Sequence, residues 1–246
     1  MLTLKSLQVG RRLKSIDCEL KPQQLVGVIG ANGAGKSTLL KLIAGLINSD
    51  SGFLSWHGED LEHKSVLQRR QLIAYLPQHT HFTEPVPVQT LIDTCQLNLQ
   101  ESSQQLLSWR QQSMQRFALS EFLQRPINEL SGGEQRRVQL ACIDAMHRPI
   151  VIADEPTASL DLNYQLMTMD WLRSLANAGT LILVALHDIA LAARYCDSLM
   201  MLDQGKLIGF GTPNEVLSDA NLAQAYQVSV EWLCNEHGVA MLARRI

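Results

Sequence analysis

The sequence has few cysteines, and none of them form a pair motif. Its five cysteines are scattered over 246 residues without a C-x-x-C spacing. An odd number of widely spaced cysteines is typical of reduced thiols in a reducing compartment and argues against a disulfide framework. We therefore expect these thiols to be reduced and mostly buried.

Long hydrophobic segments are also missing. The longest apolar run covers residues 181–186, whereas a membrane-spanning helix needs about 20 apolar residues. Residues 1–5 lack the charged and then apolar pattern of a signal peptide. The sequence thus predicts a soluble protein, which a partner must hold in place if it works at a membrane.

Neither sign of charge predominates. Lys and Arg total 21, and Asp and Glu total 24, which gives a net charge of −3. Proteins that coat nucleic acid need a basic surface, so this balance argues against a nucleic-acid partner. With 46% hydrophobic and 18% charged residues, the composition is that of a globular protein with a sizeable core.

Short apolar runs alternate with helical patterns along most of the chain. This alternation predicts a doubly wound α/β core around a parallel sheet. The first 20 residues have the alternating pattern of short strands. Glutamine is dense between residues 79 and 147, where β-branched residues are few. There we expect an inserted helical subdomain with helices near 88–99, 101–117 and 119–124.

The end of the chain has its own pattern. A hairpin with its turn at Gly205 is expected within residues 198–210, followed by a helix near 214–225 and a short tail. The predicted organisation is one domain, 1–246, with a catalytic core (1–78 and 148–225), a helical subdomain (79–147) and a C-terminal tail (226–246).

Residues 30–37, GANGAGKS, fit the phosphate-loop pattern G-x-x-x-x-G-K-[ST]. Small residues let backbone N–H groups curve around phosphate oxygens, and the following helix directs its positive end at the same anions. Lys36 supplies a flexible positive charge, and the Ser37 hydroxyl is placed to ligate Mg²⁺. A chance glycine-rich turn is the alternative, but the motif lies between a predicted buried strand (25–29) and a predicted helix (37–46), as phosphate binding requires.

Two adjacent carboxylates follow the apolar run at residues 150–153. In a parallel sheet, ligands bind in the crevice at the carboxyl ends of the strands. Asp154 is therefore predicted to hold Mg²⁺, and Glu155 to polarise the attacking water as a general base. Alone, such a pair is more typical of a solvated turn, and the phosphate loop upstream is what favours the functional interpretation.

Residues 130–135, LSGGEQ, resemble the signature motif of the ABC ATPases. Around it, other motifs match that family in order: Gln78 after Y-L-P resembles the Q-loop glutamine, Asp161 in S-L-D the D-loop, and His187 the switch histidine. The resemblance spans about residues 2–225. It implies ATP hydrolysis on a P-loop NTPase (RecA-like) core with a mainly parallel sheet, an N-terminal antiparallel β subdomain and an inserted helical subdomain.

The resemblance also implies a homodimer that holds each ATP between two copies. Ser131, Gly132 and Gly133 offer a hydroxyl, two amides and a helix start, which suit an anion held by the other subunit. Ser131 equally suits a helix N-cap with Glu134 three residues later, and the two roles are compatible.

Three groups of site residues follow from the resemblance. The catalytic residues are Glu155, His187 and Gln78, and the residues expected to hold Mg²⁺ are Ser37, Gln78 and Asp154. The residues expected to bind ATP are Gly30, Asn32, Gly33, Gly35, Lys36, Ser37, Thr38, Ser131, Gly132, Gly133 and Asp161. A structural role is the usual one for a lone histidine after a strand, and the neighbouring motifs favour the functional role for His187.

One feature departs from the family pattern. Members usually stack adenine on an aromatic side chain before the phosphate loop, yet no Phe, Tyr or Trp precedes Phe53. Arg11 or Arg12 over the base is one alternative, and a loosely held adenine is another. The pair His79 and His81 is more typical of a solvated loop than of a metal site, because two ligands do not make a site.

The remaining features bear on what ATP hydrolysis drives. One nucleotide-binding unit without a fused membrane segment resembles bacterial importers built from separate chains, in which the ATPase lies at the cytoplasmic face of the membrane. Permease subunits would dock in a groove lined by residues 79–88, and a substrate-binding protein would take part indirectly. Residues 211–226 resemble ATPases that serve iron-chelate and vitamin B12 importers, with a lean toward cobalamin; a ferric siderophore or haem is the alternative. An ABC ATPase acting on ribosomes or DNA is less favoured, because the sequence has neither a second unit nor long coiled coils.

Overall fold

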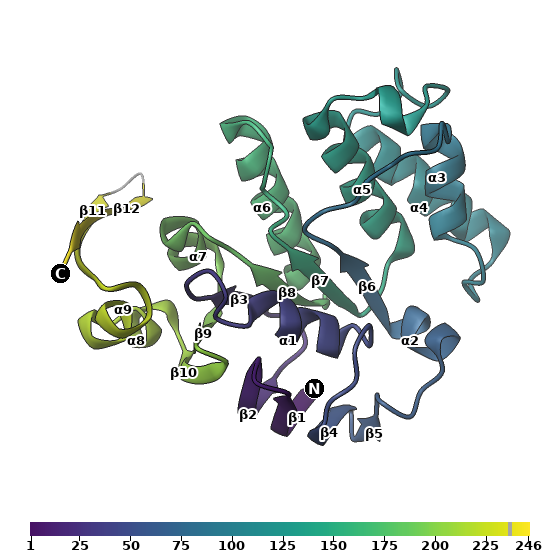
Figure 1. Ribbon diagram of the computed structural model, residues 1–246. Helices are drawn as coiled ribbons and strands as arrows, with labels where there is room; N and C mark the ends of the chain where they lie inside the picture. Colours follow the sequence, from purple (N-terminus) through teal and green to yellow (C-terminus); the bar gives the residue numbers. More distant parts are fainter. Residues whose placement is uncertain (236–237) are drawn as a thin grey trace.

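The computed structural model describes residues 1–235 and 238–246 (Figure 1). Its strands are β1 (Leu2–Val9), β2 (Leu13–Leu20), β3 (Leu25–Ile29), β4 (Ser51–Trp56), β5 (Glu59–Asp60), β6 (Ile73–Leu76), β7 (Ile150–Asp154), β8 (Leu181–Ala185), β9 (Ser198–Asp203), β10 (Lys206–Gly211), β11 (Val228–Asn235) and β12 (Gly238–Arg245). Its helices are α1 (Lys36–Ile43), α2 (Val66–Leu72), α3 (Val88–Cys95), α4 (Ser103–Arg116), the 3₁₀ turn η1 (Ile127–Glu129), α5 (Gly132–Met146), α6 (Leu162–Asn177), α7 (Ile189–Tyr195), α8 (Pro213–Val216) and α9 (Asp219–Tyr226).

The central sheet has the strand order β10–β9–β3–β8–β7–β6. All of its neighbouring strands are parallel except β10, which pairs antiparallel with β9. Every residue of β3, β7 and β8 is buried, because helices or the second sheet cover both faces. This double burial explains the continuous apolar runs of the sequence, and the mainly parallel α/β fold is confirmed.

A second sheet, β2–β1–β4–β5, is antiparallel and is formed by the N-terminal part of the chain. It packs with α1 against one face of the central sheet, where side chains such as Leu39, Ile152 and Leu183 form one apolar cluster. The alternate residues of the central strands, such as Val151 and Ile182, point to the other face of the sheet. There they form a second cluster with α5, α6 and α7. The expected N-terminal antiparallel β subdomain is therefore present.

Helices α3, α4 and α5 gather on one side of the molecule, as Figure 1 shows, and α5 packs against both α3 and α4. The buried Asp144 of α5 fastens this group to the core. Its carboxylate accepts hydrogen bonds from Ser113 of α4 and from the indole of Trp171 of α6, at 2.7 and 2.8 Å, and pairs with Arg116 at 2.6 Å. A buried carboxylate needs such partners to offset its desolvation.

The prediction of a helix at 119–124 is wrong. Helix α4 ends at Arg116, and Ala118 adopts a left-handed backbone with φ 49°. The N–H groups of Ala118 and Leu119 turn back to carbonyls of the last turn of α4, and the fully buried Leu119 side chain draws the following turn into the core. Tertiary burial thus overrides the helical tendency of this segment.

The expected helix near 214–225 is divided into α8 and α9. Ser218 caps the second helix by accepting the Asn221 N–H, so the chain begins a new helix there. The segment expected as a short tail forms the antiparallel hairpin β11–β12 after Gln227, which has a φ of 58°. Across the part of the chain that the structure describes, no helix combines the length and the apolar character needed to cross a membrane.

Candidate active site

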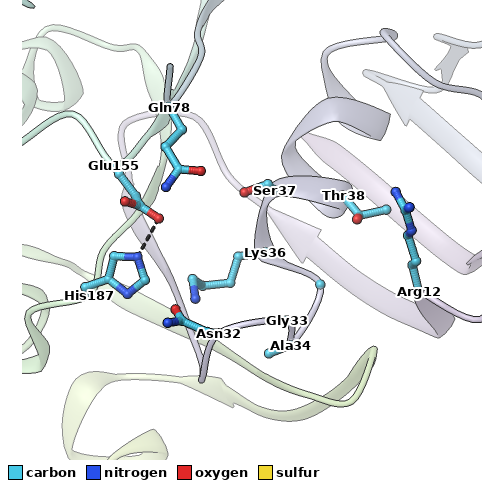
Figure 2. Close-up of a pocket in the computed structure, with 11 residues that line it drawn as sticks. Arg12, Asn32, Gly33, Ala34, Lys36, Ser37, Thr38, Gln78, Glu155 and His187 are labelled. Atoms are coloured by element: carbon cyan, nitrogen blue, oxygen red, sulfur yellow. Dashed lines mark hydrogen bonds and ion pairs between the residues drawn. The ribbon is translucent and has the colours of Figure 1, made fainter. Parts of the chain in front are cut away.

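A cavity of about 660 Å³ lies at the carboxyl ends of β3, β7 and β8 (Figure 2). Segments far apart in the sequence converge there: the β1–β2 turn, the loop between β3 and α1, and the residues that follow β6, β7 and β8. The lining residues are Arg12, Asn32, Gly33, Ala34, Gly35, Lys36, Ser37, Thr38, Gln78, Glu155 and His187. Most of the residues expected to bind ATP or to act in catalysis therefore share one cavity.

The loop between β3 and α1 needs glycine for steric reasons. Gly30 and Gly35 have φ values of 145° and 110°, and a Cβ atom at these positions would lie 2.2 Å from the Leu202 carbonyl and 2.9 Å from the Arg12 carbonyl. No side chain caps the first turn of α1, so its N–H groups are open toward the cavity. This arrangement is suited to binding phosphate groups.

The Lys36 ammonium group lies inside this loop. Its Nζ donates to the carbonyls of Gly30 and Ala31 at 2.7 and 3.2 Å. Burial lowers the pKa of Lys36, while the carboxylates of Glu155 and Asp154 act in the opposite direction. The loop thus holds a positive charge in place before any phosphate arrives.

Asp154, the last residue of β7, is 1% exposed, and neither of its carboxylate oxygens has a hydrogen-bond partner within the described ranges. Burial raises its pKa, whereas the nearby Ser37 hydroxyl and the lysines Lys41 and Lys36 lower it. A buried and unpaired carboxylate is costly to the folded protein. Two free oxygens of this kind beside a serine hydroxyl fit a Mg²⁺ ion, which prefers oxygen ligands.

Glu155 and His187 lie side by side at one end of the cavity (Figure 2). The His187 Nε2 is in hydrogen-bond contact with Glu155 Oε1. Glu155 has a left-handed backbone, with a φ of 51°, and its side chain lines the cavity, whereas that of Asp154 does not. One carboxylate is therefore buried beneath the loop, while the other lines the cavity where a water molecule could approach a phosphate.

Arg136 of α5 is a residue that the sequence did not single out. Its guanidinium group is buried and donates to the carbonyls of Pro77, Asp154, Glu155 and Pro156, at distances of 2.6 to 3.2 Å. Burial lowers its pKa to about 10, opposed by Asp154 and Glu155, so it stays charged at neutral pH. Its neighbour Arg137 instead donates to the Phe117 and Ala118 carbonyls after α4, and nothing in the sequence distinguishes the two arginines.

The expected signature and D-loop residues do not line this cavity. Ser131 caps α5 in a capping box with Glu134, and Asp161 caps α6 by accepting the Tyr164 N–H. The Cβ position of Gly132 has open space around it, and Gly132 lines a separate cavity of about 140 Å³ together with Gln78. Within one copy of the chain, these residues are apart from the phosphate loop.

A glycine loop between a buried strand and a helix, with one carboxylate beneath it and another beside it, defines a P-loop nucleotide hydrolase. A model of the ABC transporter family matches residues 13–158, which is more than half of the chain. The chain belongs to the ABC transporter family, and it is an ATPase of that family.

Two curated relatives and a solved structure illustrate the similarity. The hemin import ATP-binding protein HmuV of Pseudoalteromonas translucida is 35% identical over 91% of this chain and 90% of its own length. The cobalamin import ATP-binding protein BtuD of Halobacterium salinarum is 34% identical over 89% of this chain, which matches 56% of that longer protein. The structure of an ATP-binding subunit of an ABC transporter superposes with a TM-score of 0.82 at 26% identity, covering 92% of this chain and 95% of that one.

Replacement of Arg136 by Lys should lower ATPase kcat at least about tenfold. Lysine keeps the charge, but it lacks the planar fork that reaches several carbonyl groups at once. Steady-state ATPase assays and thermal unfolding would measure the effect. Arg137→Lys is the matched control, because Arg137 lies on the same helix but donates to the Phe117 and Ala118 carbonyls after α4 and to none of the carbonyls that Arg136 bonds. An equal loss of kcat in both variants would mean that Arg136 only stabilises the fold.

Proposed function

We propose that this chain is the ATP-hydrolysing subunit of a bacterial importer for a metal-bearing macrocycle, either haem or cobalamin. The observation that carries the proposal is the cavity that joins the phosphate loop to Glu155 and His187. The direction and the substrate class rest on the import names of relatives that are similar over about 90% of this chain. Both hemin and cobalamin occur among those names. We therefore propose haem or cobalamin as the substrate and no longer favour cobalamin, as the sequence alone did.

The residues of the cavity have distinct roles in this proposal. Ser37, Asp154 and Gln78 would hold Mg²⁺, which neutralises charge on the phosphate oxygens of ATP. Lys36 and the loop N–H groups bind the β- and γ-phosphates. Glu155 accepts a proton from the attacking water, and His187 keeps that carboxylate turned toward the γ-phosphate.

The position of Ser131, Gly132 and Gly133 supports a homodimer. They lie at the start of α5, outside the cavity, and Ser131 and Gly132 are exposed. A second copy would bring this helix start against the γ-phosphate held by the first. Asp161 would lie in the same interface, because Ser159 of the same loop is within 3.5 Å of the Cβ position of Gly133.

The segment that follows Gln78 supports docking of a membrane subunit. Residues 79–81 are exposed, and Phe82 packs only partly against the core. Gln78 lines both the ATP cavity and the smaller cavity beside residues 79–81. A permease helix bound there would thus be coupled to the γ-phosphate through Gln78, and it would hold the ATPase at the cytoplasmic face of the membrane.

Glu155→Gln should reduce ATPase kcat at least about 100-fold while the variant still binds ATP, because the amide cannot accept the proton of the attacking water. Light scattering during gel filtration should then show an ATP-dependent dimer that persists. Glu121→Gln, an exposed change outside the cavity, serves as the control. Turnover near that of the wild type in Glu155→Gln would reject the assignment of the general base.

Arg12 is proposed to lie over the adenine base. It lines the end of the cavity opposite Glu155 and His187, as Figure 2 shows. Its carbonyl abuts Gly35 and Gly205, which fixes its backbone beside the phosphate loop. A guanidinium plane stacks on an aromatic base without reading the pattern of hydrogen-bonding groups at its edge.

Arg12→Ala should therefore raise the KM for ATP about three- to tenfold with little change in kcat. For the wild type, the KM values for ATP and GTP should be similar. Arg11→Ala is the matched control, since Arg11 does not line the cavity. The same rise in KM for both variants would point to general charge attraction and not to base stacking.

Uptake in cells tests the transported substrate. Deletion of the gene should abolish uptake of either labelled haem or labelled cobalamin, measured side by side with a labelled ferric siderophore. The wild-type gene should restore uptake, and the Glu155→Gln gene should not. Unchanged uptake of haem and cobalamin in the deletion strain would reject the proposed substrate class and leave the ATPase assignment intact.

A further inference from the structure

The phosphate loop contacts the C-terminal part of the chain through one side chain. Tyr226, the last residue of α9, lies 196 positions from Gly30 in the sequence. The Gly30 N–H donates a hydrogen bond of 2.7 Å to the Tyr226 hydroxyl oxygen. Nothing in the sequence indicates that a residue at the start of the expected tail meets the first residue of the loop.

The peptide groups around Gly30 are held on three sides. Tyr226 accepts from the N–H group, and the Leu202 carbonyl packs so closely that no Cβ fits at Gly30. The Gly30 carbonyl in turn accepts the hydrogen bond from Lys36 Nζ at 2.7 Å. A continuous chain of contacts therefore runs from the tyrosine hydroxyl through Gly30 to the lysine ammonium.

Helix α9 is a firm support for this contact. Ser218 caps its start, and Leu222 and Ala225 are buried in the core. The Gln224 amide also donates to Asp203 at 3.3 Å, at the turn where the Gly205 N–H bonds the Ala34 carbonyl of the phosphate loop at 2.9 Å. The same helix thus supports both ends of the loop.

The tyrosine stays neutral in this environment. Burial raises the pKa of Tyr226 to about 12, although the Gly30 N–H lowers it. The hydroxyl therefore remains a neutral hydrogen-bond partner at physiological pH and adds no negative charge beside the phosphate site. The ring itself packs against the central core.

We propose that Tyr226 is a positioning residue for the phosphate loop, where its hydroxyl fixes Gly30 and thereby places the Lys36 ammonium for the β- and γ-phosphates. The inference rests on the assignment of this loop as the ATP site. It gives helix α9 a role in nucleotide affinity. The motifs of the loop do not reveal this role.

The test is Tyr226→Phe in the full-length chain, which keeps the packed ring and removes only the hydroxyl. The KM for ATP, and the Kd of a fluorescent ATP analogue, should rise about fivefold, because one hydrogen bond that orders Lys36 is lost. The value of kcat should stay within about twofold, since Lys36 is still present. Unchanged KM and Kd values would overturn the proposal, even if the unfolding temperature fell.

Tyr195→Phe is the matched control. This change also removes one hydrogen bond of a partly buried hydroxyl, because the Tyr195 hydroxyl donates to Asp170 at a distance of 3.0 Å. The bond lies away from the cavity. It should lower stability to a similar degree without changing KM. An equal rise of KM in both variants would mean that general loosening of the fold accounts for the effect, and the proposal would fail.

A double-mutant cycle separates this proposal from the assignment of the site. If Tyr226 acts through Lys36, the change Tyr226→Phe should not weaken analogue binding further in a Lys36→Ala background. Additive effects would overturn the route through Lys36. A wild-type chain that binds no analogue, or a Lys36→Ala variant that binds as tightly as the wild type, would instead contradict the ATP site itself.

Discussion

The guanidinium group of Arg136 holds together the two parts of the chain on which the active site depends. From α5, a helix of the group that gathers on one side of the molecule, it reaches carbonyls at the end of β7 and in the segment that leads to Gln78. Strands β6 and β7 are already paired in the central sheet, and the guanidinium group bonds the carbonyls just beyond their carboxyl ends, where strand pairing has stopped. A single buried cation with a planar fork satisfies all of them and sets the positions of Asp154 and Glu155.

Around this contact, the site places two adjacent carboxylates in different environments. Asp154 ends a fully buried strand and has no hydrogen-bonding partner within the ranges described here, while Glu155 turns by a left-handed backbone toward His187. The first environment suits a cation, and the second suits proton transfer. The start of α5 at Ser131 lies outside the cavity of its own chain. In the proposed arrangement, a second copy supplies this helix start to the site.

Much of the fold could be predicted from the sequence. Apolar runs of four to six residues identified the buried strands, and the glycine pattern before Lys36 located the phosphate loop, because both are local consequences of burial and steric space. The helix expected at 119–124 was wrong because burial of Leu119 outweighed local propensity. The β11–β12 hairpin was missed because its pairing depends on packing against α7 and α9.

By itself, the sequence determined the chemistry of the loop: which residues have no Cβ, where the lysine and the carboxylates occur, and that a strand and a helix flank them. The tertiary structure alone decided which of two adjacent arginines bonds the Glu155 carbonyl, that Arg12 lies at one end of the cavity, and that Tyr226 meets Gly30. The physical reason is that spacing along the chain fixes only the contacts between near neighbours. Contacts between distant residues depend on how helices rotate and pack when the whole core is buried.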